Sequence, residues 1–169
     1  MTRIICLLTF LLLALPSYAQ NFGTYPNFSL TPGLTRDLTV QKICRTKWGS
    51  DARAVTARMK QNVKDEYNFD IKTCPLTVMR KKRGHYAEID HLIPRSLGGA
   101  DDVKNLWPQC YEPVNKDKSK QADGAHKKDQ LETYLHKALC KAPSEETLKQ
   151  YQDGIRYNWI SLYHRIYGD

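Results

Sequence analysis

The sequence has few of the features that mark a membrane-spanning, zinc-binding or repeat protein. Its longest uncharged, mostly apolar run, Ile4–Leu15, has twelve residues, whereas a helix needs roughly 20 to cross a bilayer. The cysteines form no CxxC pair, so a structural zinc knuckle is not indicated. There is no internal repeat and no sign of a second domain. A single compact domain remains.

The N-terminal segment is typical of a secretory signal peptide. Arg3 supplies a positive start, the apolar run follows, and Ser17-Tyr18-Ala19 places small residues correctly for cleavage after Ala19. We therefore predict a signal peptide over residues 1–19, a secreted or periplasmic location, and no stable membrane insertion. The alternative is a segment that stays uncleaved as a membrane anchor.

Basic side chains outnumber acidic ones in the remaining chain, residues 20–169. The formal net charge is +8 for the whole sequence, and it falls to +7 when Arg3 is removed. A positive balance favours polyanionic partners, with nucleic acid first and anionic lipid headgroups second. A basic surface that serves only solubility is the alternative, so the charge supports other observations without deciding the function.

Four cysteines remain after the signal peptide: Cys44, Cys74, Cys110 and Cys140. An even number in an exported chain suggests two disulfides. Four cysteines permit three pairings, and the sequence does not choose among them. Our working hypothesis is the nested arrangement, with Cys74 bonded to Cys110 and Cys44 to Cys140. Four free, buried thiols are the alternative.

Apolar periodicity predicts helices on both sides of a central region. A short helix is expected over residues 38–46, and a longer one over 51–67 with Ser50 as its N-cap. A third begins at Asp123 or Gly124 and runs to residue 140. The last follows the cap Ser144 to the chain end, with Gly154 as a predicted kink. The segments 20–35, 68–77 and 110–122 are expected to be an extended arm, a connection and a loop.

The central region, Tyr86–Gln109, holds the residues with the clearest chemical potential. A short alternating segment, 86–90, ends in the adjacent acid and imidazole of Asp90 and His91. Gly98-Gly99 permits a tight loop. Asn105 then opens a second apolar run, Leu106-Trp107-Pro108. A carboxylate, an imidazole and an amide are the groups needed to hold a hard cation and activate a water.

This arrangement of DH, a GG-containing loop and NLWP resembles the HNH nucleases, members of the ββα-metal (His-Me finger) group. The resemblance covers Tyr86 to about Cys140. It implies an α+β fold, in which a small ββα-metal core of two short antiparallel strands and a helix, over residues 85–140, is packed among several flanking α-helices.

The resemblance also implies roles for individual residues. His91 would be the general base and Asp90 a metal ligand. Asn105 would orient the base, by a hydrogen bond that fixes the backbone or the imidazole of the first strand. The cofactor would be one divalent cation, with Mg²⁺ or Mn²⁺ favoured over Zn²⁺ because most ligands are oxygens.

The last position of the HNH pattern is open in this sequence. His126 lies in the first turn of the predicted third helix, where the resembled fold has its second metal ligand, and we favour it over Asn115. The same helix carries a KDxxE run, in which Lys128 and Asp129 would support the metal ligands. The alternative for Lys128 and Asp129 is an exposed ion pair of little energetic value.

Four consecutive basic residues precede the motif: Arg80, Lys81, Lys82 and Arg83. We predict that they, together with Arg95, contact the phosphate backbone of a nucleic acid. The alternative for the basic run is a solvated loop.

The expected function is that of a metal-dependent endonuclease. It is expected to act as a monomer on DNA, with RNA as a further candidate substrate. One alternative is an inactive module of the same fold that only binds polyanions. Another is a nuclease toxin delivered to rival or host cells, with an immunity partner that the sequence does not identify.

Overall fold

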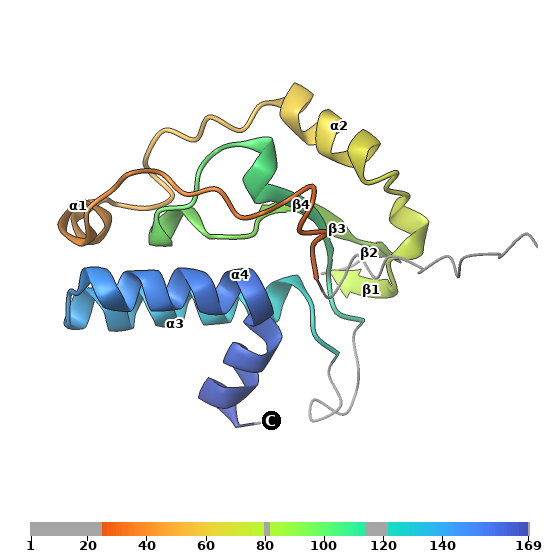
Figure 1. The fold of residues 1–169 in the computed structure, drawn as a ribbon. Coiled ribbons are helices and arrows are strands. Elements are labelled where there is room, and N and C mark those ends of the chain that lie inside the picture. Colours follow the sequence, from red (N-terminus) through yellow and green to blue (C-terminus); the bar gives the residue numbers. More distant parts are fainter. Residues whose placement is uncertain (1–24, 80–81, 114–121, 169) are drawn as a thin grey trace, which may run out of the picture.

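The computed structural model describes residues 25–79, 82–113 and 122–168, so the predicted signal peptide lies outside the described residues. It combines helices with two small antiparallel sheets (Figure 1), which confirms a mixed α+β class. The helices are α1 (Val40–Arg45), α2 (Ala57–Glu66), α3 (Ala125–Lys141) and α4 (Glu145–Tyr167). The strands are β1 (Leu76–Met79), β2 (Lys82–His85), β3 (Ala87–His91) and β4 (Leu106–Cys110). Short 3-10 turns are η1 (Ile71–Thr73), η2 (Arg95–Leu97) and η3 (Val103–Asn105).

The two strands expected in the central region are present as β3 and β4. They pair antiparallel, with Asp90 opposite Trp107 and His91 opposite Leu106. Every residue of β4 is buried, as expected for a strand covered on both faces. The hairpin lies between α2 on one side and the pair α3 and α4 on the other (Figure 1). Helix α3 follows β4 in the chain, so the order is strand, strand, helix.

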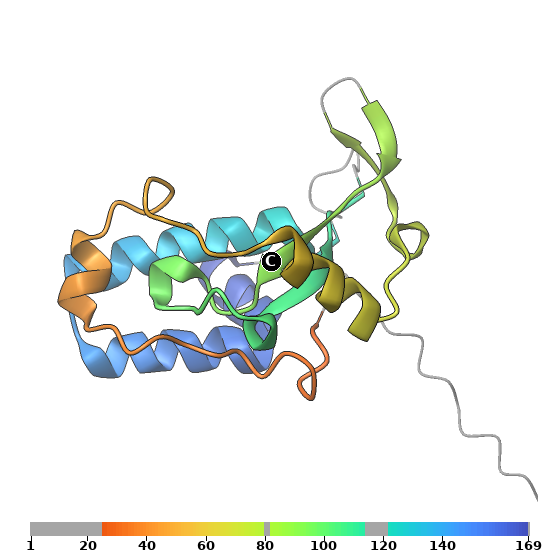
Figure 2. The ribbon, with the colours of Figure 1, turned by 90° about the horizontal axis from the view of Figure 1, so that it is seen from above.

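The hairpin β1–β2 was not predicted from the sequence. Its register pairs Leu76 with His85 and Thr77 with Gly84, and it projects away from the helices (Figure 2). The sequence of β2, Lys82–His85, contains a glycine and no β-branched or apolar residue, so strand propensity does not reveal it. The disulfide Cys74–Cys110 fixes the hairpin to the end of β4.

Helix α2 begins six residues later than predicted, and Ser50 is not its N-cap. Thr56 is the cap, and its side chain accepts a hydrogen bond of 3.1 Å from the Met59 amide. The preceding segment is held in a non-helical path because its groups bind the central loop. Ala54 N–H donates to Asp101, and Asp51 pairs with Arg95.

Helices α3 and α4 lie side by side (Figure 1) and match the prediction closely at their starts. Ser144 caps α4 by accepting from the Thr147 amide. The kink in α4 lies at Asn158, with φ −163° and ψ 73°, and not at Gly154. The Asn158 side chain accepts from the Ser161 amide and so caps the second part of α4. A Cβ at Gly154 would lie 2.9 Å from Leu162, so the glycine serves close packing.

One hydrophobic core joins these elements, and its largest buried side chains include Trp107 and Trp159. The second disulfide, Cys44–Cys140, fixes α1 to α3. Both pairs agree with the nested arrangement that was our working hypothesis, so that hypothesis is confirmed. Within the described ranges, no helix has the length and apolar character needed to cross a membrane.

Candidate active site

His91 ends β3 with its imidazole buried against a carboxylate. Its side chain is 6% exposed, and Nε2 lies 2.8 Å from Oδ1 of Asp101. A carboxylate only accepts hydrogen bonds, so the neutral imidazole donates through Nε2–H, and Nδ1 carries the lone pair. The geometry therefore assigns Nδ1 as the nitrogen that can take a proton.

Asp101 is held as a charged partner for His91. Burial raises its pKa, but the hydrogen bonds from the Ala54 amide and from His91, together with Arg95, hold the pKa below the usual value for Asp. The Ala54 amide lies 2.7 Å from Oδ2 of Asp101, and Arg95 Nε lies 3.2 Å from Oδ1. Sequence reasoning missed Asp101, although its place just after the Gly98-Gly99 loop was a usable indication.

His91 is neutral at physiological pH. Burial lowers its pKa below the usual 6.5, and the hydrogen bond with Asp101 and the charge of Asp90 oppose that shift without reversing it. The positive charge of Arg53 lowers the pKa further. A neutral imidazole is the form that serves as a general base.

Asn105 fixes the backbone of the loop that follows His91. Its amide is fully buried; Oδ1 accepts from the Ile93 amide at 2.9 Å, and Nδ2 donates to the carbonyls of Ile93 and Ala100. The expected contact was to the backbone or the imidazole of the first strand; the side chain of Asn105 instead binds the backbone of the loop that follows β3. Asn105 thus acts on His91 through the chain and not by touching the ring.

The two loop glycines meet different requirements. Gly98 has φ +84°, a left-handed conformation that favours glycine. At Gly99 the requirement is space, because a Cβ would lie 1.8 Å from the Ile93 carbonyl oxygen. The loop therefore closes tightly around the Asn105 amide.

Asp90 points to α3, where it meets a buried lysine. Nζ of Lys128 lies 2.7 Å from Oδ2 of Asp90 and 2.6 Å from the His91 carbonyl oxygen, and it also contacts Glu132. Lys128 is fully buried, so the alternative reading of this run as an exposed ion pair is wrong for Lys128. Burial by itself lowers the pKa of Lys128, but Asp90 and Glu132 raise it above its usual value and keep the ammonium charged.

Two further carboxyl groups lie near Asp90. Burial and the charge of Asp90 raise the pKa of Glu88 to about 7. The same two causes raise the pKa of Asp129. Glu88 also shares a hydrogen bond with Tyr111. Carboxylates that raise one another's pKa in this way are stabilised by protons or by a cation.

His126 lies in the first turn of α3, as predicted, and its side chain is 53% exposed. Nδ1 lies 2.8 Å from Oε2 of Glu112, and the ring stacks on Tyr111 with centroids 4.6 Å apart. Glu112 also accepts from the amides of His126 and Lys127, and so caps the start of α3. No pattern in the sequence indicated Glu112 as a cap, because it is 14 residues from His126 in the chain.

The predicted metal ligands are compatible with a hard cation in their chemistry, but they do not form a ready cage. Among the residues that the structure describes, no group of three or more His, Cys, Asp or Glu side chains lies close enough to hold a metal ion. Of the predicted ligands, Asp90 offers an oxygen ligand and His126 an imidazole, which suits Mg²⁺ or Mn²⁺. A cation at Asp90 has to share the carboxylate with Lys128. Asn115, the other candidate, lies outside the described residues.

The predicted nucleic-acid contacts are placed only in part. Arg80 and Lys81 lie outside the described residues, Lys82 pairs with Met79 in the β1–β2 register, and Arg83 is exposed. Arg95 is 12% exposed, and its guanidinium contacts Asp51, the Ala52 carbonyl oxygen and Asp101. These contacts give Arg95 a role in fixing the central loop, and its contact with nucleic acid stays a prediction.

Comparisons of the chain with protein-family models, with curated proteins and with solved structures gave no match.

Proposed function

We propose that the protein is an HNH-type, metal-dependent endonuclease that hydrolyses phosphodiester bonds in nucleic acid. The observation that carries the proposal is the buried His91 imidazole, which lies 2.8 Å from Asp101 through Nε2 and keeps Nδ1 as a base. Asp90 stands next to it on the same strand. The order β3, β4, α3, with His126 at the start of the helix, supports the same assignment.

His91 and Asp101 supply the proton chemistry that this reaction needs. Hydrolysis requires a water to lose a proton as its oxygen attacks phosphorus, and an alkoxide to leave. Nδ1 of His91 takes the proton, and the charged Asp101 stabilises the imidazolium that forms. Asn105 keeps the backbone after His91 in place during this step. By family chemistry, the products carry a 5′ phosphate and a 3′ hydroxyl.

The metal requirement is part of the proposal. Asp90 and His126 are the residues that, by the resemblance, would hold one divalent cation, and when bound it would supply positive charge opposite the phosphate. Lys128 already provides one positive charge beside Asp90. Its ammonium fixes the Asp90 carboxylate in position through the 2.7 Å ion pair.

The decisive experiment offers circular, linear and single-stranded DNA and single-stranded RNA to the protein without residues 1–19. A panel of divalent cations is compared with EDTA. We expect cutting with Mg²⁺ or Mn²⁺, none in EDTA, and a large loss in Asp90→Asn. An exposed acid outside the site, Asp65→Asn in α2, is the matched control. The absence of cutting with every cation, or full activity of Asp90→Asn, contradicts the proposal.

One observation favours a second candidate, a module that binds polyanions without cutting them. The Lys128 ammonium occupies one side of Asp90, and the described residues form no group of three metal ligands. This candidate predicts tight DNA binding that EDTA does not change, and no cleavage under any of the conditions above.

A further inference from the structure

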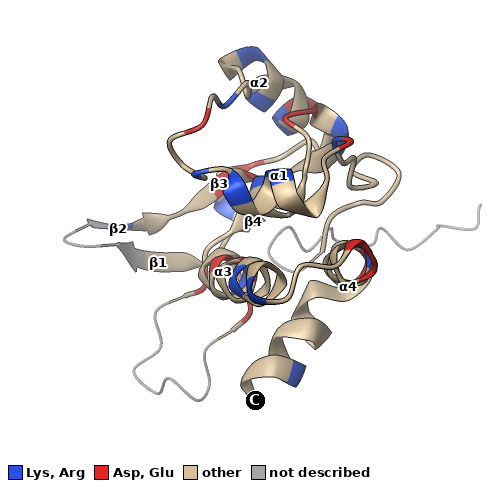
Figure 3. Cartoon of the chain, turned by 90° about the vertical axis from the view of Figure 1, so that its left-hand side faces the viewer, with Lys and Arg blue, Asp and Glu red and all other residues tan. Residues whose placement is uncertain are grey.

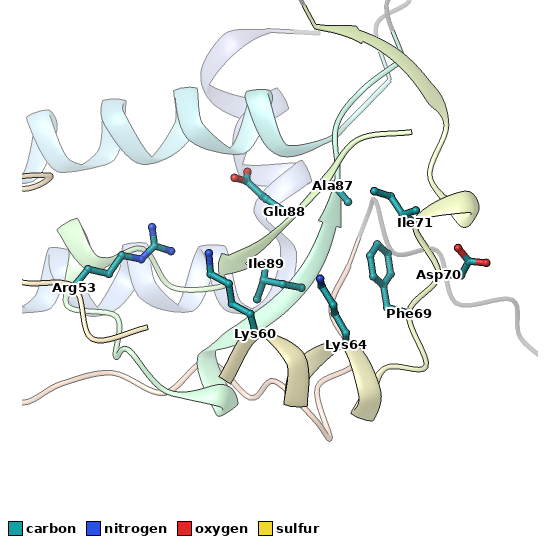
Figure 4. Close-up of a pocket in the computed structure, with 9 residues that line it drawn as sticks. All are labelled: Arg53, Lys60, Lys64, Phe69, Asp70, Ile71, Ala87, Glu88 and Ile89. Atoms are coloured by element: carbon teal, nitrogen blue, oxygen red, sulfur yellow. The ribbon is translucent and has the colours of Figure 1, made fainter. Parts of the chain in front are cut away.

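A cavity of about 670 Å³ lies between α2 and β3, next to the candidate active site. Figure 4 shows the nine residues that line it. Its wall includes Glu88 and Ile89 of β3, the strand that ends in Asp90 and His91. The volume falls within the roughly 300–1,000 Å³ that is usual for ligand sites. Asp90 and His91 do not line the cavity themselves, but a ligand in it would lie against the strand that carries them.

One part of the cavity wall is basic. Arg53 comes from the segment before α2, and Lys60 and Lys64 come from α2 itself. All three side chains are exposed, and Figure 4 shows them directed from the same side toward β3. The residue after Arg53, Ala54, donates its amide hydrogen bond to Asp101, the partner of His91, which places this end of the basic row near the reacting centre. Figure 3 shows that Lys and Arg recur along α2.

The wall also has two acidic residues, Asp70 and Glu88, against its three basic ones. Asp70 accepts a hydrogen bond of 2.9 Å from the Lys72 amide, which fixes its carboxylate at the start of η1. Glu88 shares a hydrogen bond with Tyr111, and in Figure 4 its carboxylate lies on the α3 side of the strand. Three positive side chains thus face the open space of the cavity.

The other end of the cavity carries apolar side chains beside Asp70. Phe69 and Ile71 lie there beside Lys64 (Figure 4), and Ala87 and Ile89 complete the wall. Ile71 is 46% exposed. Cations that track a phosphate backbone beside an aromatic ring are typical of single-strand binding sites, because any base can stack on a ring. In a duplex the bases are stacked inside, so the apolar end could not reach them.

We propose that this cavity binds an unpaired nucleotide of a single-stranded nucleic acid. Arg53, Lys60 and Lys64 hold its phosphates beside His91, and Phe69 receives its base. The inference rests on the proposed function in naming the substrate, and it adds that single strands, or unpaired stretches of duplexes, are preferred. The strand would enter past η1 and run along β3 toward the catalytic imidazole.

The first test measures binding without cutting. The fluorescence anisotropy of a labelled oligothymidine strand, and of a labelled duplex of equal length, is followed in EDTA. The variant carries Arg53→Gln, Lys60→Gln and Lys64→Gln, and the control carries Arg45→Gln, Lys141→Gln and Lys149→Gln, three exposed cations elsewhere. Three lost phosphate contacts weaken single-strand binding about 50-fold near physiological salt, and lower the salt slope by about 2. Equal affinities of variant and control overturn the inference.

The second test addresses the base. Phe69→Leu keeps an apolar side chain against the core but removes the ring, and should weaken single-strand binding by about five- to 150-fold. Duplex binding should not change, and Phe69→Tyr should bind as the unaltered protein does. Thermal unfolding confirms that each variant is folded.

Equal affinity of the unaltered protein for strand and duplex, or an equal loss for both in Phe69→Leu, overturns the unpaired-nucleotide site. The results of these tests separate this inference from the proposed function. A protein that cuts nucleic acid but binds strand and duplex equally contradicts only the unpaired-nucleotide site. A protein that prefers single strands but does not cut contradicts only the nuclease proposal.

Discussion

Among the charged residues that the structure describes, Lys128 should be the one whose replacement, Lys128→Met, destabilises the protein most. Methionine keeps the length of the side chain but removes the ammonium, which leaves Asp90 and Glu132 facing each other without their shared partner. Removing one member of a buried ion pair costs about 3–5 kcal/mol. For a domain of this size, that lowers the melting temperature by roughly 6–20 °C.

The pH dependence of the stability loss in Lys128→Met identifies the unpaired carboxylates as its cause. Orphaned carboxylates can be neutralised by protons, so the stability difference between Lys128→Met and the unaltered protein should shrink as the pH falls from 8 toward 5. Adding Glu132→Gln to Lys128→Met should recover part of the loss at pH 8, because one of the two orphaned charges disappears.

Thermal and urea unfolding, with the disulfides intact, measure both effects. Lys149→Met is the matched control, because Lys149 is 78% exposed and pairs with Asp153 at the same spacing that joins Lys128 to Glu132. It should change stability by less than about 0.5 kcal/mol. A Lys128→Met variant as stable as this control, or a loss that does not depend on pH, refutes the reasoning.

Three further predictions concern stability. Asn105→Asp should lower the free energy of unfolding in urea by about 3 kcal/mol, because two buried carbonyls lose their donor and face a carboxylate. An equal loss in the control Asn62→Asp, at an exposed position, would contradict this. Glu88 has a folded-state pKa of about 7 against 4.5 for the free side chain, so its ionisation costs stability increasingly from pH 4.5 to 7 and constantly above. Glu88→Gln should therefore stabilise the protein by about 2 kcal/mol at pH 8, after allowance for partial exposure, and by little at pH 4; unfolding at both pH values checks the sign. The disulfides close segments of 96 and 36 residues, so chain entropy gives upper values of about 4.7 kcal/mol for Cys44–Cys140 and about 3.8 for Cys74–Cys110. Paired Cys→Ser variants should reproduce that order in thermal unfolding, and the reverse order would show that native contacts outweigh chain entropy.

The sequence predicted those elements whose signals are local. Alternation gave β3, helical periodicity gave α3, and Ser144 marked the start of α4, because each depends on residues close together in the chain. The start of α2 was predicted wrongly because Ser50 offered a plausible cap. The outcome was decided from a distance, by the hydrogen bond from Ala54 to Asp101 and by the ion pair of Asp51 with Arg95.

The candidate site likewise combines residues that were predictable from local sequence with partners that were not. Asp90, His91 and Asn105 stand in one motif and were predictable as a group. The partners that determine their behaviour come from elsewhere: Asp101 binds the imidazole of His91, and Lys128 reaches Asp90 across 38 residues. The burial of Lys128 had no indication in a run that reads as a solvated helix. The basic cavity depends on how α2 lies against β3, which periodicity does not specify.

The central claim is that His91 is the base of a metal-dependent nuclease. Its most direct test is the rate at which His91→Ala cuts the best substrate in Mg²⁺ or Mn²⁺, relative to the unaltered protein and to His164→Ala in α4. Loss of a general base predicts a rate about 10²–10⁴-fold lower, with DNA binding in EDTA unchanged and partial recovery when imidazole is added. A His91→Ala protein that cuts as fast as the His164→Ala control contradicts the account.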